Sequence, residues 1–269
     1  MISGITIYDT VQISSKEALE LAEFLFEKLC LPITGASYYE FFEDGEHPEG
    51  ESFDVKEVSV SALKEKISID NTMEFSIYSE KSEILPWFAS FHFNTEEGIL
   101  GLSHINIQYP FINSSNEIVK NFFQDFCKKF SCSYAIHYNF ERWIDAFYYA
   151  QGDNFVNLYD FECSSLFNKE CPGRYRGRAR YRGNKLRMVY DFNVINNLHL
   201  NIAVKNISLK EWILEDEKRG RLSKLNNDMW VWEVEGEELV DVNYILGEEG
   251  VLISWRLKPI KKSPRKLPG

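Results

Sequence analysis

The sequence predicts an α+β protein built on antiparallel β-sheet, with capped amphipathic helices packed on one face of the sheet. Apolar and polar residues alternate across 75–109, as in strands with one buried face, and polar turns interrupt the alternation. Directly afterwards, apolar residues recur every four positions, on one side of a helix: Ile118, Phe122, Phe126 and Phe130. We expect this helical stripe to lie on the sheet and to share one core with Trp87 and Phe91.

Capping boxes predict where three helices begin. In 14–17, 114–117 and 208–211, a serine precedes a glutamate by three residues, so hydroxyl and carboxylate satisfy free backbone N–H groups. The first two segments also match at an offset of 100 residues, where Ile5, Ile7, Ser14, Ser15, Glu17, Phe26 and Lys28 correspond to Ile105, Ile107, Ser114, Ser115, Glu117, Phe126 and Lys128. Residues 199–202 repeat the pattern of 104–107, so we predict three strand-then-helix units.

The remaining chain predicts further strands and a division into units. Strands are expected at 134–140, 155–161, 185–192 and 198–207, with a short helix at 141–150 and loop at 164–173. Segments 230–235, 239–246 and 251–257, separated by Gly- and Glu-rich turns, predict a C-terminal β-meander. We predict an α+β unit at 1–150, with two strand–helix repeats. A β-rich unit with one helix and the meander is expected at 151–258, followed by a basic flexible tail at 259–269.

Charge is divided unevenly along the 269 residues, whose net charge is −11. Two acid-free segments, 174–187 and 256–266, contain 13 of the 30 basic residues, which leaves 17 bases against 41 acids, or −24, elsewhere. Such a surface repels nucleic acid and attracts basic partners. Apolar runs are too short to span a membrane, no signal peptide is expected, and the five cysteines lack CxxC spacing. We therefore expect a cytoplasmic protein with reduced thiols.

Two acid-rich loops are the candidate binding sites for a partner protein. Segment 40–54 contains seven acids and no base, and 233–249 is similar. If these loops serve binding rather than solubility, their charge accelerates association with a basic partner while aromatic residues anchor it. The expected partner-binding residues are Glu46, Glu49, Glu51, Glu235, Glu237 and Glu238.

An arginine ladder is the sharpest local pattern. Alternate residues are arginines in one short segment: Arg174, Arg176, Arg178, Arg180 and Arg182. In an extended chain all five project from one face, with Tyr175 and Tyr181 on the other. The ladder suits a charged edge strand that prevents aggregation, a contact with a partner or a second copy, or binding of an anion such as phosphate or nucleic acid.

Four histidines occur in the pattern His-apolar-Asn, which on strands belongs to the polar side of a half-buried sheet. Two converging histidines suit acid–base chemistry on a phosphodiester, and the catalytic candidates are His92, His104 and His199. The pattern resembles the paired His-apolar-Ser/Thr motifs of two-histidine phosphoesterases, with Asn in place of the hydroxyl residue. No HxH, HExxH, CxxC, GxGxxG or P-loop motif is present, so we expect neither metal nor cofactor.

An aromatic α+β chain with acidic loops and no enzymatic motif resembles bacterial immunity proteins that occlude a toxin. Phage-encoded inhibitors of defence enzymes are similar. This resemblance implies a non-enzymatic inhibitor that binds a basic or nucleic-acid-processing enzyme, without a membrane and with homo-oligomers possible. The alternatives are an enzyme acting on phosphoesters or nucleotides through paired histidines, and an RNA-binding module that uses the arginine ladder and the basic tail.

Overall fold

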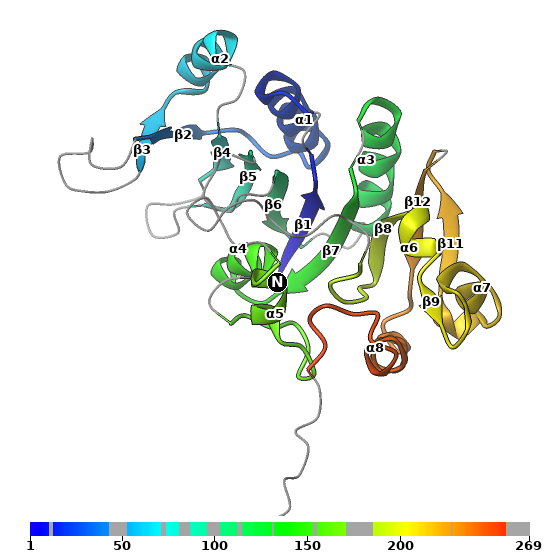
Figure 1. The fold of residues 1–269 in the computed structure, drawn as a ribbon. Coiled ribbons are helices and arrows are strands. Elements are labelled where there is room, and N and C mark those ends of the chain that lie inside the picture. Colours follow the sequence, from blue (N-terminus) through cyan, green and yellow to red (C-terminus); the bar gives the residue numbers. More distant parts are fainter. Residues whose placement is uncertain are drawn as a thin grey trace, which may run out of the picture.

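Ten strands form one antiparallel sheet in the computed structural model, in the order β11-β12-β8-β7-β1-β6-β5-β4-β2-β3 (Figure 1). The structure describes residues 1–10, 13–42, 53–70, 74–80, 87–95, 103–111, 115–130, 132–152, 155–170, 185–226 and 228–256. The strands are β1 (Ile2–Tyr8), β2 (Gly35–Phe41), β3 (Phe53–Val58), β4 (Phe75–Ser79), β5 (Ala89–Asn94), β6 (His104–Pro110), β7 (Tyr134–Phe140), β8 (Phe192–Asn196), β11 (Arg221–Lys224) and β12 (Met229–Glu233). The predicted α+β class and antiparallel sheet are confirmed.

Helices cover both faces of the sheet, whereas the sequence predicted them on one (Figure 1). The first face carries α1 (Ser15–Lys28), α2 (Val60–Ile69) and α3 (Ser115–Lys129). The second face carries α4 (Trp143–Gln151), α5 (Ser164–Asn168), α6 (Asn197–Leu200), α7 (Leu209–Leu214) and α8 (Leu239–Glu248). A 3-10 turn, η2 (Glu217–Arg219), and a small hairpin, β9 (Ala203–Val204) with β10 (Ile207–Ser208), complete the described elements.

The alternation of each strand builds two cores. Ile5 and Ile7 of β1 enter the core beneath α1 and α3, while Tyr8 of the same strand enters the core beneath α4 and α5. Phe91, Phe122 and Phe126 share the first core, as predicted. Trp87 does not, because it lies before β5 and packs its ring against Trp143, 4.9 Å away, on the second face.

The two predicted strand–helix repeats are present, and they meet at the centre of the sheet. β1 pairs with β6 so that Thr6 lies opposite Asn106, its equivalent at the offset of 100 residues. The two units are therefore related by an approximate twofold rotation through this pair, and their helices α1 and α3 run antiparallel on the first face. The capping box of Ser14 with Glu17 is confirmed at the start of α1. Its counterpart Ser114 lies outside the described residues.

Several predicted strands in the C-terminal half are wrong. Residues 155–161 and 185–191 contain no strand, β8 begins only at Phe192, and 198–207 forms α6 and the small hairpin. The third unit thus keeps its capping box, Ser208 with Glu211, but not its strand. The C-terminal meander is also wrong: only β12 is a strand, 239–246 is helical, and the described part of 251–257 is irregular apart from isolated bridges. Part of the predicted 164–173 loop forms α5.

A fully buried ion pair lies in the second core. Arg187, a member of one basic segment of the sequence, is completely buried, with its Nε atom 3.6 Å from Oε1 of Glu162. Its Nη1 donates to the carbonyl of Tyr149 at 2.5 Å, and its guanidinium group stacks 3.9 Å from the centre of the Tyr149 ring. Glu162 accepts a hydrogen bond from the Tyr149 hydroxyl. Arg187 therefore stabilises the interior and adds nothing to the basic surface.

The sheet joins residues from both predicted units, since β7 pairs with β8. The division of the chain at residue 150 stays a prediction. Within the ranges that the structure describes, no helix combines the length and apolar character that crossing a bilayer requires.

Candidate functional site

Helix α8 presents an acidic and apolar stripe on its outer side. Its inner side is fixed by Val242, Asn243, Leu246 and Gly247, all buried in the second core. The outer side consists of exposed residues at helical spacing, together with Glu237 just before the helix: Val240, Asp241, Tyr244 and Glu248. We call these five residues the α8 stripe. Val240 is 55% exposed and Tyr244 41% exposed, so the stripe offers apolar area as well as negative charge.

Buried contacts hold α8 in place. The Asn243 side chain accepts from the backbone N–H of Val189 and donates to the Val189 carbonyl, each at 2.8 Å. Gly247 lets the helix approach Trp255, because a Cβ atom at this position would lie 2.1 Å from the indole ring. The Trp255 ring in turn lies 5.5 Å from that of Tyr244, in an edge-on arrangement. The stripe is therefore carried by a rigid element, on which exposed side chains need little further ordering to bind.

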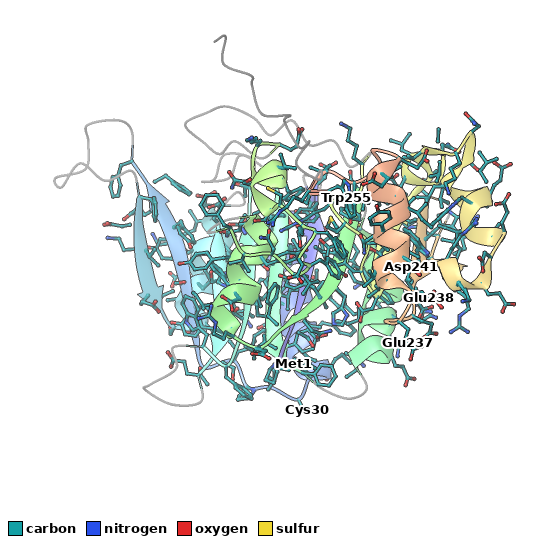
Figure 2. All side chains as sticks on the ribbon, turned by 90° about the horizontal axis from the view of Figure 1, so that it is seen from below. Met1, Cys30, Glu237, Glu238, Asp241 and Trp255 are labelled. Carbon is teal, nitrogen blue, oxygen red and sulfur yellow. The ribbon has the colours of Figure 1, made fainter. Side chains whose placement is uncertain are left out.

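Only part of the predicted acidic surface is without counter-ions. Glu235 forms an ion pair of 3.2 Å with Arg221, and Glu238 one of 3.8 Å with Lys218, bases that are remote in sequence. Among the described residues, Glu237 and Asp241 have no ion-pair partner within 4.0 Å. Figure 2 shows Glu237, Glu238 and Asp241 gathered at the start of α8, away from Trp255. Uncompensated charge is thus centred on Glu237 and on Asp241, which the sequence did not single out.

The other predicted surface sites lie outside the described residues. These are the first acidic loop, with Glu46, Glu49 and Glu51, the basic tail, and the arginine ladder formed by Arg174, Arg176, Arg178, Arg180 and Arg182. Their roles stay predictions.

Two of the three candidate catalytic histidines lie close together. His92 on β5 and His104 on β6 point from neighbouring strands to the second face, where Asn94 lies opposite His104 in the sheet. The Ser76 hydroxyl lies 2.6 Å from Nδ1 of His92, while Nε2 of His92 is buried and has no hydrogen-bond partner among the described residues. Burial, with a smaller effect of His104, lowers the pKa of His92 to about 3. His92 is therefore neutral near pH 7.

These histidines are enclosed rather than open to a substrate. His92 is 5% exposed and Ser76 2%, and the Phe147 ring of α4 lies 5.0 Å from the imidazole. The third candidate, His199, is on α6 rather than on a strand. It donates or accepts at Asn196 and reaches the Lys185 carbonyl at 3.1 Å, so it serves local structure at a different place. The described residues contain no group of three or more His, Cys, Asp or Glu suited to a metal ion.

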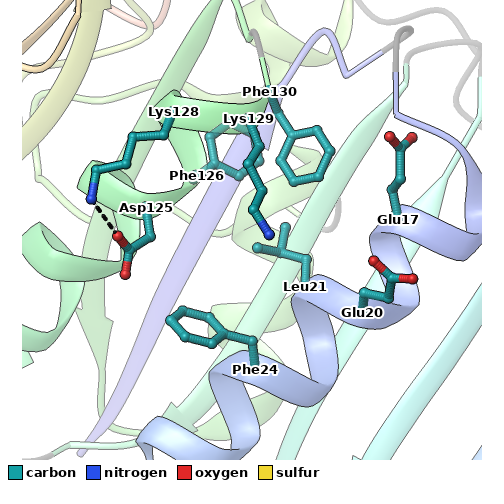
Figure 3. A pocket seen from close by; sticks show the side chains of 9 residues that line it. All are labelled: Glu17, Glu20, Leu21, Phe24, Asp125, Phe126, Lys128, Lys129 and Phe130. Carbon is teal, nitrogen blue, oxygen red and sulfur yellow. Dashed lines mark hydrogen bonds and ion pairs between the residues drawn. The ribbon is translucent and has the colours of Figure 1, made fainter.

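A groove between α1 and α3 is a feature that the sequence analysis missed. Its cavity, of about 330 Å³, is lined by Glu17, Glu20, Leu21, Phe24, Asp125, Phe126, Lys128, Lys129 and Phe130 (Figure 3). The sequence predicted that the α3 stripe lies on the sheet, and Phe122 and Phe126 do so. Ile118 and Phe130, at the two ends of that stripe, are only half-buried and face the groove region.

Neither a protein-family model nor a curated protein matches this chain. Among solved structures, the chain is similar to the Pseudomonas aeruginosa T6SS protein PA0821. The TM-score is 0.51 and the sequence identity 12%, over 94% of this chain and 76% of that chain. At this identity the similarity shows the fold alone: an α+β architecture that a bacterial T6SS protein shares.

Proposed function

We propose that the protein is a non-enzymatic inhibitor, of the immunity or anti-defence type, that binds and occludes a partner protein with a basic surface. The observation that carries this proposal is the α8 stripe. It combines the uncompensated carboxylates of Glu237 and Asp241 with the exposed side chains of Val240 and Tyr244. A nucleic-acid-processing enzyme fits as the partner because its substrate-binding surface is basic.

The two kinds of side chain have separate roles in this proposal. Carboxylates without counter-ions attract a basic surface over roughly one Debye length, about 8 Å at physiological salt, and thereby raise the association rate. Tyr244 and Val240 then lose water in the complex and slow its dissociation. The fold shared with a bacterial T6SS protein is compatible with such a role, and it adds no residue to the argument.

The test uses the partner recovered by pull-down from the native host and identified by mass spectrometry. Glu237→Lys with Asp241→Lys should slow association about tenfold or more at low salt, with a smaller change in dissociation. Tyr244→Ala should mainly accelerate dissociation. The matched control is Glu27→Lys with Glu65→Lys, which reverses two exposed acids on α1 and α2. An association rate that ignores salt and the α8 substitutions alike would refute the proposal.

The proximity of His92 and His104 is the observation that favours the enzymatic alternative. Under our proposal, His92→Gln with His104→Gln leaves partner binding intact, provided that the variant folds. Purified wild-type protein that hydrolyses nucleotides or cyclic phosphodiesters, with loss of turnover in a folded His104→Gln variant, would favour the enzyme instead.

A further inference from the structure

The groove between α1 and α3 extends along most of both helices. Beside the cavity in Figure 3 lies a second one of about 290 Å³, lined by Phe24, Lys28, Ile118, Asn121, Phe122, Gln124 and Asp125. Phe24 and Asp125 line both cavities, so the two are continuous. From Glu17 to Lys28 the groove follows α1 for roughly 16 Å, or three helical turns at about 1.5 Å per residue.

The groove has an apolar floor and oppositely charged edges. Leu21, Phe24, Phe126 and Phe130 form the floor. Glu17 and Glu20 line the α1 edge, and Lys128 and Lys129 line the α3 edge, as Figure 3 shows. This arrangement follows from the antiparallel helices, since the acidic beginning of α1 lies beside the basic end of α3.

One charge on each edge lacks a partner. Glu17 is engaged in the capping box with Ser14, and Lys128 forms a 2.8 Å ion pair with Asp125. In contrast, Glu20 and Lys129 have no ion pair within 4.0 Å among the described residues, and they do not reach each other across the groove. The two residues thus leave unmatched charges of opposite sign on either side of apolar surface.

We propose that this groove binds an amphipathic helix of a partner protein, with an apolar stripe between one basic and one acidic edge. A helix buries its stripe on Phe24 and Phe130, while its basic edge meets Glu20 and its acidic edge meets Lys129. The groove accommodates about three turns, so two apolar anchors about seven residues apart enter the two cavities. The surface lies on the first face, opposite the core that carries α8, and does not depend on the α8 stripe.

A second copy of this chain is a poorer occupant. The outward residues of α1 and α3 are polar and exposed, among them Lys16, Glu27, Asn121 and Gln124. A copy of the same face would therefore bring polar ridges, not apolar anchors, to the floor of the groove.

The test titrates the full chain with three synthetic 18-residue helical peptides that share one leucine stripe. Their edges are lysine and glutamate, glutamate on both sides, or lysine on both sides. The wild-type groove should prefer the mixed peptide by about 3–10-fold at low salt, as expected for a few exposed charge pairs. Fluorescence anisotropy gives the dissociation constants, and sedimentation velocity reports the oligomeric state.

Charge reversals make the test specific to the two edges. Glu20→Lys should shift the preference to the all-glutamate peptide, Lys129→Glu should shift it to the all-lysine peptide, and the double variant should restore the preference for the mixed peptide. Phe24→Ala should weaken all three peptides alike. Asp241→Lys, in the α8 stripe, should change none of them, so failure here is distinguishable from failure of the α8 proposal. Absence of binding, a preference indifferent to the reversals, or a dimer that Lys129→Glu dissociates would each overturn the inference.

Discussion

His92 and His199 are both enclosed by aromatic rings, and burial lowers the pKa of His92 to about 3 and that of His199 to about 4. In the unfolded chain both return to about 6.5, so below that pH the unfolded state binds protons that the folded state does not. Stability should therefore be complete above pH 6.5 and fall as the pH decreases. Between pH 7.5 and 5, we expect a loss of about 2 kcal/mol per histidine in urea denaturation.

Substitution separates the two contributions. In His199→Gln the amide retains an acceptor for the Asn196 backbone, and the pH-dependent loss should fall by about half. A pH dependence identical to that of the wild-type protein would show that His199 is protonated in the folded state.

The buried pair Arg187–Glu162 permits a second prediction for single residues. Arg187→Met leaves the Glu162 carboxylate in the core without its cation and should cost about 3–5 kcal/mol in the free energy of unfolding. Combining it with Glu162→Gln removes the unpaired charge, so the double variant should be more stable than Arg187→Met. Additive losses in chemical denaturation would contradict this coupling.

At the scale of the elements, α1 and α3 depend on a cap and on an aromatic stripe. Ser14→Ala removes the acceptor for the Glu17 N–H and should cost about 1 kcal/mol. Phe122→Ala leaves a cavity in the first core, where Phe122 is 2% exposed, and should cost about 3–5 kcal/mol. Equal and negligible shifts of the denaturation midpoint for both variants would refute the role of these contacts.

The first half of the fold could be predicted because its local signals agree with its tertiary contacts. Strands β4, β5 and β6 alternate with period two, and Ser14 starts a helix whose apolar side faces the sheet. In α8 the signals conflict. Glycine and glutamate at both ends of 239–246 are typical of hairpin turns, yet Leu239, Val242 and Leu246 have helical spacing, and Gly247 packs against Trp255.

The candidate site was predicted to a similar extent. Acid content identifies the segment that contains Glu237, but the counter-ions of Glu235 and Glu238 come from remote residues that only the folded chain brings near. Tyr244 and Val240 were assigned to a strand, so their exposure beside Asp241 could not be foreseen. The groove likewise depends on how far apart two helices lie on the sheet, which neither helix encodes alone.

For the whole molecule, the continuous sheet predicts how the chain unfolds. Since β7, β1 and β8 connect residues on both sides of position 150, both cores should melt together. We expect one transition in far-UV and near-UV circular dichroism, and Phe122→Ala, in the first core, should lower its midpoint for both signals. Two separate transitions, only one of them sensitive to Phe122→Ala, would support two independently folding units instead.

The register at the centre of the sheet has a further consequence. Thr6 and Asn106 occupy the same place in their respective units and are paired with each other. A shorter chain with a single unit would therefore offer a second molecule of itself the very edge that β1 and β6 share here. The geometry is that of a homodimer fused into one polypeptide by duplication. After such a fusion each half is free to diverge, and here only one of the two central helices is followed by the second-face helices that culminate in α8.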